Sequence, residues 1–157
     1  DFGGHDRVAR EGVLQAMILV RLHDWLPRLN AWVVANRARA FSWGEWDCAT
    51  AAADAVREIT GQDVLGALKW TSQASAMRTL KAAGGMQAAV SERLGGPIGV
   101  AFAQRGDVVL IHDDSIARTP EGAVAVCLGE SVAAPSADGL AFFPLDRASV
   151  AWRVGNG

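Results

Sequence analysis

Apolar positions in the first third of the chain repeat at helical spacing. From Met17 onward, leucine, tryptophan and valine recur every three or four residues, which predicts one broad apolar stripe along a helix. Pro27 lies inside this run, and because proline removes a backbone donor we expect it to kink the helix or to begin a new turn. A second, alanine-rich helix is predicted over residues 48–60, with Asp47 as its N-cap and Gly61 as its C-cap.

Weaker helices and a run of strands follow. Glycine pairs end two further predicted helices, over residues 72–83 and 86–94. The hydrophobic period then changes from that of a helix to the alternation of strands. The predicted strands are residues 107–111, 123–128, 139–143 and 149–154. Helices first and a strand meander last predict the α+β class, with an antiparallel sheet packed against the alanine-rich helix.

The chain reads as one folding unit with an N-terminal addition. It has 157 residues, enough to bury a core without metal or disulfide support. Neither a repeat nor a linker divides residues 17–157, which we expect to form a single domain. Residues 1–16 lack this patterning and are expected to be a leader or extension, and one that is not native to the domain.

Composition and charge narrow the classes of partner. Half of the residues are hydrophobic and 20% are charged, a balance typical of folded domains. The net charge of −2 provides no basic field for a phosphate backbone, so nucleic acid is not an expected partner. Apolar runs such as residues 16–20 are far too short to span a membrane.

Cys48 is the residue with the most chemical interest. At the first turn of a predicted helix, a thiol meets free amide groups and the positive end of the helix dipole, which predicts a lowered pKa. A nucleophilic cysteine also needs a base within hydrogen-bond reach. The alternative is a small buried apolar side chain. Histidines, cysteines and carboxylates do not cluster at metal-ligand spacing, and no phosphate-cradling motif occurs, so neither a metal nor a cofactor is expected.

Three segments carry a family resemblance. Residues 43–49 (WGEWDCA), 105–110 (RGDVVL) and 123–129 (AVAVCLG) resemble the NlpC-type cell-wall peptidases over roughly residues 17–155. The resemblance implies a papain-like fold with Cys48 as nucleophile, beside Asp47, at the start of a central helix. It also implies a catalytic histidine opening the strand that follows the Gly-Asp strand. The tryptophan-rich lead is similar to a phage and prophage branch encoded beside tail-tip components.

Two catalytic positions of that family are occupied by alanine. The histidine falls on Ala123 and the third polar residue falls on Ala133. Without a base, the cysteine loses general acid catalysis worth about 10²- to 10⁴-fold. His112 is the alternative base: in an antiparallel hairpin the end of its strand lies beside the start of the next, near Ala123. It is equally well explained as an exposed residue at the edge of a loop.

Two functions remain open. The first is a structural or assembly protein of a phage or phage-like tail tip, made in the host cytoplasm and residing in the virion, whose partners are other phage tail proteins. It predicts an exposed apolar patch, at residues 41–46 or 142–144. The second is an active cysteine hydrolase, an endopeptidase or amidase that cleaves peptidoglycan, with Cys48 as nucleophile and His112 as base.

Overall fold

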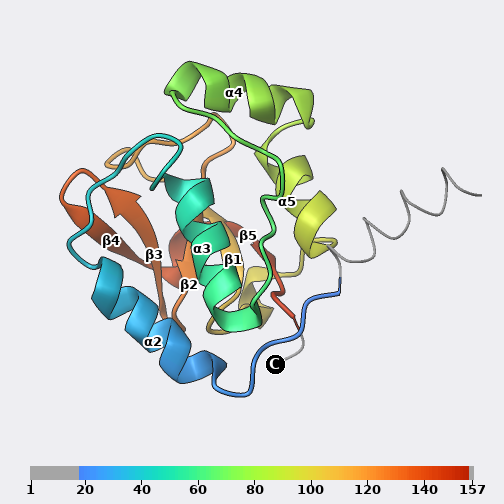
Figure 1. Cartoon of the computed structure of the whole chain (residues 1–157), viewed down its shortest axis with the longest axis vertical. Coiled ribbons are helices and arrows are strands. Elements are labelled where there is room, and N and C mark those ends of the chain that lie inside the picture. Colours follow the sequence, from blue (N-terminus) through green and yellow to red (C-terminus); the bar gives the residue numbers. More distant parts are fainter. Residues whose placement is uncertain (1–17, 156–157) are drawn as a thin grey trace, which may run out of the picture.

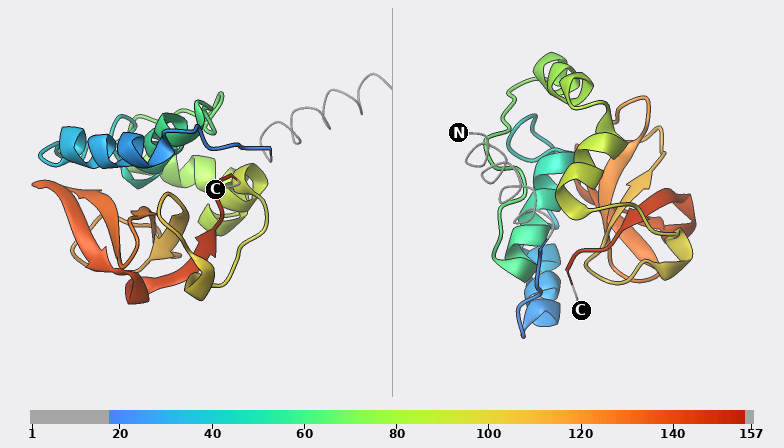
Figure 2. Two further views of the ribbon diagram at one scale, coloured as in Figure 1. Left: turned by 90° about the horizontal axis from the view of Figure 1, so that it is seen from below. Right: turned by 90° about the vertical axis from the view of Figure 1, so that its right-hand side faces the viewer.

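The chain forms two layers, with helices covering one face of a five-stranded antiparallel sheet (Figures 1 and 2). This computed structural model describes residues 18–155. The predicted α+β class is confirmed. The predicted leader, residues 1–16, lies outside the described residues.

The elements follow one another in the predicted order. The helices are α2 (Trp25–Asn36), α3 (Cys48–Thr60), α4 (Gln73–Ala82) and α5 (Met86–Leu94), with short 3-10 helices η1 (Val100–Phe102) and η2 (Leu145–Arg147). The strands are β1 (Val108–Ile111), β2 (Ala123–Cys127), β3 (Ser131–Ser136), β4 (Gly139–Pro144) and β5 (Ala148–Trp152). Their order in the sheet is β4-β3-β2-β1-β5.

Helix α3 has the bounds that the sequence predicts, because both of its ends are fixed locally. Asp47 and Thr50 form a capping box, in which each side chain accepts a hydrogen bond from the other residue's backbone amide. Gly61 ends the helix in the left-handed region at φ 77°, and its amide donates to the carbonyl of Arg57. The helix lies centrally over the sheet (Figure 1), and its buried alanines allow the backbone to approach the strands closely.

Helix α2 begins later than the sequence predicts. The apolar stripe indicates a helix from Met17, but the first helical residue is Trp25. The preceding segment is held in a different conformation because the amide of Leu22 donates to the carbonyl of Ile59 in α3, at 2.8 Å. Pro27 lies in the first turn of α2, where its missing donor costs nothing, so it marks the start of the helix rather than a kink inside it.

Strand β3 is an addition to the predicted sheet. It lies between β2 and β4, and its central residues are buried. The sequence does not predict this strand, because residues 132–135 (VAAP) show no alternation of apolar and polar side chains and contain a proline. Pro135 pairs with Leu140 of β4, while the paired positions with β2 are confined to Val132 and Ala133, so the missing amide disturbs no ladder there.

Both faces of the sheet are covered. Toward α3, the strands contribute Val108, Leu110, Val124, Val126, Ala133 and Trp152. On the other face, the apolar side chains of β1, β2 and β3 pack with residues of the η1 and η2 segments. A sheet buried on both faces is built from continuous apolar runs rather than from alternating ones.

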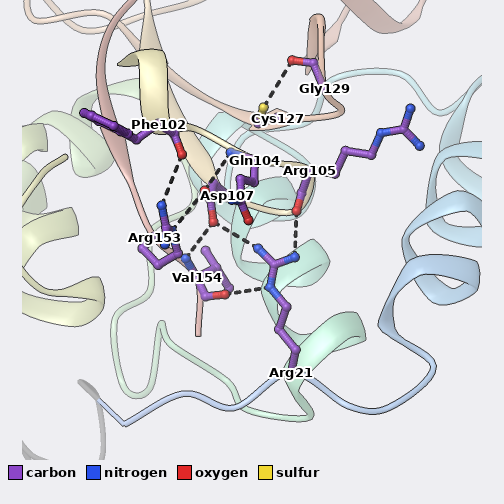
Figure 3. A network of polar contacts seen from close by, with 9 residues as sticks. All are labelled: Arg21, Phe102, Gln104, Arg105, Asp107, Cys127, Gly129, Arg153 and Val154. Atoms are coloured by element: carbon purple, nitrogen blue, oxygen red, sulfur yellow. Dashed lines mark hydrogen bonds and ion pairs between the residues drawn. The ribbon is translucent and has the colours of Figure 1, made fainter. Parts of the chain in front are cut away.

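A buried network around the Arg21–Asp107 ion pair joins the two ends of the described chain (Figure 3). Arg21 donates to Asp107 at 3.0 Å, to the carbonyl of Val154 at 2.8 Å and to that of Arg105 at 2.7 Å. Asp107 also accepts hydrogen bonds from the amides of Gln104 and Val154. Burial lowers the pKa of Arg21, and the charge of Asp107 opposes that shift. Asp107 therefore links the segments that contain Arg21 and Val154 to the start of β1.

Candidate functional site

Cys48 lies where α3 begins, beside the start of β2. It is the first residue of α3, and it packs against the apolar clusters on both faces of the sheet. Backbone groups of Val124 in β2 and of Ala49 face its sulfur. The thiol is thus held between a helix N-terminus and the first residues of a strand.

Asp47 anchors two loops at this point. Its buried carboxylate accepts hydrogen bonds from the amide and hydroxyl of Thr50 at 2.9 and 3.1 Å, and from the amide of Gly44 at 2.9 Å. The indole of Trp70, 23 residues further along the chain, also donates to it at 2.6 Å. Neutral donors therefore occupy both carboxylate oxygens, and Asp47 fixes the geometry of the chain on either side of Cys48.

The thiol of Cys48 is less acidic than its position on the helix predicts. Burial and the adjacent charge of Asp47 raise its pKa to about 12. The surrounding backbone groups of Val124, Ala49 and Cys48 itself lower it, but by less. The prediction of a lowered pKa for Cys48 is wrong, because desolvation of the thiol outweighs the effect of the helix dipole. Cys48 is a protonated thiol at neutral pH.

Among residues 18–155, alanines stand at both positions where the resemblance places the catalytic partners of Cys48. Ala123, where the resemblance to cell-wall peptidases places a histidine, is the first residue of β2 and is completely buried. Ala133, at the third position, is buried opposite Val126 on the neighbouring strand. Methyl groups of these two alanines complete the apolar core and offer no lone pair to a proton.

His112 lies one residue beyond the predicted pairing. Ile111 faces Ala123, so His112 follows the end of β1 and stands by Gly122, with Nε2 3.3 Å from where a β-carbon of that glycine would lie. Its side chain is exposed. Within residues 18–155 no hydrogen bond connects any histidine to the sulfur of Cys48.

The loop between β1 and β2 forms one wall of a small cleft at the thiol. Ala117, Arg118 and Thr119 line this cleft together with Cys48. The loop is tethered by Glu121, whose carboxylate accepts hydrogen bonds from the first amides of α5, at Met86 (2.7 Å) and at Gln87. This contact satisfies free donors of the helix and favours a negative charge there.

Trp70 and Glu121 are the site residues that sequence reasoning misses. Each acts on a partner at least 23 residues away in the chain. Local pattern carries no signal for such contacts. Within residues 18–155, no group of three or more histidine, cysteine or acidic side chains is arranged to hold a metal ion. None of the helices in this range is long and apolar enough to cross a membrane.

Comparison with known proteins identifies a family without assigning an activity. A search of curated proteins found no match to the chain. A family profile described as "Domain of unknown function (DUF6950)" matches residues 20–154, which include both α3 and the complete sheet. The chain therefore belongs to the DUF6950 family.

Proposed function

We propose that this protein is a non-catalytic structural or assembly component of a phage-like tail tip, built on a papain-like, NlpC-type fold that has lost its catalytic base. The carrying observation is the buried Ala123 at the start of β2, next to Val124, whose backbone faces the sulfur of Cys48. At the position where a base would activate the thiol stands a methyl group, and the thiol itself is protonated at neutral pH.

The surface also supports a role in binding other tail proteins. The prediction that Trp46 belongs to an exposed aromatic patch is wrong, because this residue is buried in the core. Phe142 is 47% exposed and lines an open groove together with Phe143 and Pro144 at the β4 edge of the sheet. An exposed aromatic side chain beside a groove is a suitable anchor for a partner protein. The proposed partners are other tail proteins, and the proposed location is the tip of the virion tail.

The second candidate is a peptidoglycan-cleaving cysteine hydrolase. One observation favours it: backbone groups of Val124 and Ala49 surround the sulfur and stabilise negative charge there. Such a site would need a hydrogen bond between His112 and Cys48, and residues 18–155 form none in this structure. Peptidoglycan would then be a substrate rather than a surface that the tail merely touches.

Purified protein incubated with peptidoglycan separates the two functions. We expect no muropeptide release by chromatography from the wild type, from Cys48→Ala or from the control Cys127→Ala. Release by the wild type and by Cys127→Ala, but not by Cys48→Ala, would establish the hydrolase and refute the non-catalytic proposal.

A genetic test addresses the tail directly. Particles made without the gene should lack complete tails in electron micrographs, and Cys48→Ala should restore them as well as the wild type does. Complete tails in the absence of the protein would contradict the structural role.

A further inference from the structure

A cavity of about 70 Å³ lies between α3 and the pair α4–α5. Its walls come from Ala53 of α3, Leu68 of the segment that follows this helix, Leu80 of α4 and Val90 of α5. Helix α4 lies at the end of the molecule, away from the sheet (Figure 1), so this wall is supported on one side only. The cavity adjoins the cleft at Cys48, and the two share the lining residues Ala49, Trp70, Leu80 and Met86.

The interior of the cavity offers almost nothing to water. Among its lining residues, only Trp70, Thr79 and Arg93 carry a polar side-chain atom. The indole of Trp70 donates to Asp47, and the hydroxyl of Thr79 donates to the carbonyl of Ser75. A buried water needs two to four polar partners, and apolar cavities without them accept apolar guests instead.

Arg93 supplies one positive charge beside this apolar space. Its side chain is 22% exposed, and one nitrogen, Nη1, donates to the carbonyl of Ala89 at 3.0 Å. The same nitrogen lies 3.8 Å from a carboxylate oxygen of Glu92, which is itself largely exposed. Within residues 18–155, Nε and Nη2 of Arg93 have no protein acceptor. A guanidinium with free donors recognises carboxylates well.

We propose that this cavity binds the aliphatic tail of a short-chain carboxylate, whose anionic head pairs with Arg93. The proposal is independent of a role in tails, since it depends only on the cavity and its rim. The ligand class follows from the two features together: the walls select an alkyl chain and Arg93 selects a single negative charge.

Titration of the whole protein with butyrate, pentanoate and hexanoate, followed by NMR of the backbone amides, tests this site. We expect shifts centred on α4 and α5, and an affinity that rises about fourfold for each added methylene as the chain fills the cavity. Ala83→Leu fills the cavity from the end of α4 and should abolish this binding. Ala82→Leu adds the same volume on the exposed neighbouring residue and should leave it unchanged.

The charged rim is tested separately with Arg93→Gln. This variant should bind hexanoate about tenfold more weakly and hexanol as the wild type does, because only the carboxylate needs the guanidinium. Equal binding by Ala83→Leu and Ala82→Leu, or shifts confined to other surfaces, would overturn the proposal. Equal loss of hexanoate and hexanol in Arg93→Gln would overturn the assignment of the head group to Arg93.

Discussion

Two buried aspartates of this protein are stabilised in different ways. Asp47 is held by neutral donors, namely backbone amides, a hydroxyl and an indole. Asp107 is held by the guanidinium of Arg21 and by two amides, with Arg153 3.5 Å away. One carboxylate organises a local helix start and the other joins distant parts of the chain.

The difference bears on what the family resemblance means. The Asp47-Cys48 and Gly106-Asp107 pairs carry much of the likeness to cell-wall peptidases. In the structure, the hydrogen bonds of both aspartates hold neighbouring parts of the fold in place. Neither aspartate is hydrogen-bonded to a histidine within residues 18–155. The two aspartates that carry the resemblance therefore have roles in shaping the fold, and these contacts do not depend on a catalytic base.

Removing the buried cation from the Asp107 network should have the largest effect. Arg21→Met removes the buried partner of this carboxylate and leaves it only the half-exposed Arg153, 3.5 Å away, so we expect a loss of about 3 to 5 kcal/mol in the free energy of unfolding. Urea denaturation measures it. The control is Arg28→Met, which breaks the exposed pair with Asp24 and should cost less than about 1 kcal/mol. Similar losses in the two variants would show that the buried pair contributes no more than the exposed one.

Removing the carboxylate of Asp47, which accepts hydrogen bonds from neutral donors only, should lower the free energy of unfolding by a smaller amount. Asp47→Ala eliminates the cap of α3 and strands the donors of Gly44 and Trp70, for a loss of about 2 to 3 kcal/mol. Ser72→Ala removes the same kind of capping box from the exposed start of α4 and should cost about 1 kcal/mol. Thermal denaturation of both variants gives the comparison. An Asp47 variant no less stable than the Ser72 variant would contradict the anchoring role.

The effect of the thiol beside Asp47 is absent at neutral pH and confined to alkaline solution. Its pKa rises from 9.0 in the unfolded chain to about 12 in the folded one. The stability that this shift contributes is complete below pH 9 and is lost between pH 9 and 12, because the unfolded state releases its proton first. In a Cys127→Ala background, stability should fall by at most about 1.4 kcal/mol per pH unit over this range. Adding Cys48→Ala should remove that slope.

A matched variant tests the origin of this pKa. Asp47→Asn keeps an acceptor for the helix cap but removes the charge next to the sulfur, so the pKa of Cys48 should fall. Ultraviolet absorbance of the thiolate during a pH titration measures it. A pKa no lower than in the wild type would mean that burial alone accounts for the shift.

Local signals explain what the sequence predicts well. Helix α3 is predicted to the residue because its cap residues, Asp47 and Gly61, are adjacent to the pattern they end. The continuous apolar runs of β1 and β2 are likewise recognisable from their own residues. Strand β3 escapes prediction because Pro135 and a short alanine-rich run give no strand pattern, although pairing on both sides stabilises it.

The chemistry of the candidate site depends on distant contacts instead. The position of Cys48 on its helix is predictable, but the direction of its pKa shift depends on how deeply the sheet and the β1–β2 loop bury it. The register that sets His112 beside Gly122 rather than Ala123 is likewise fixed by the pairing of two strands. Neither is visible in the residues adjoining the cysteine.

The bond between Glu121 and the start of α5 has a mechanical consequence. The carboxylate of Glu121 connects the β1–β2 loop, which covers the thiol of Cys48, to α5, which lines the neighbouring cavity. A guest that displaces α5 would therefore pull on that cover, and the rate at which an electrophile modifies Cys48 would report whether the adjoining chamber is filled.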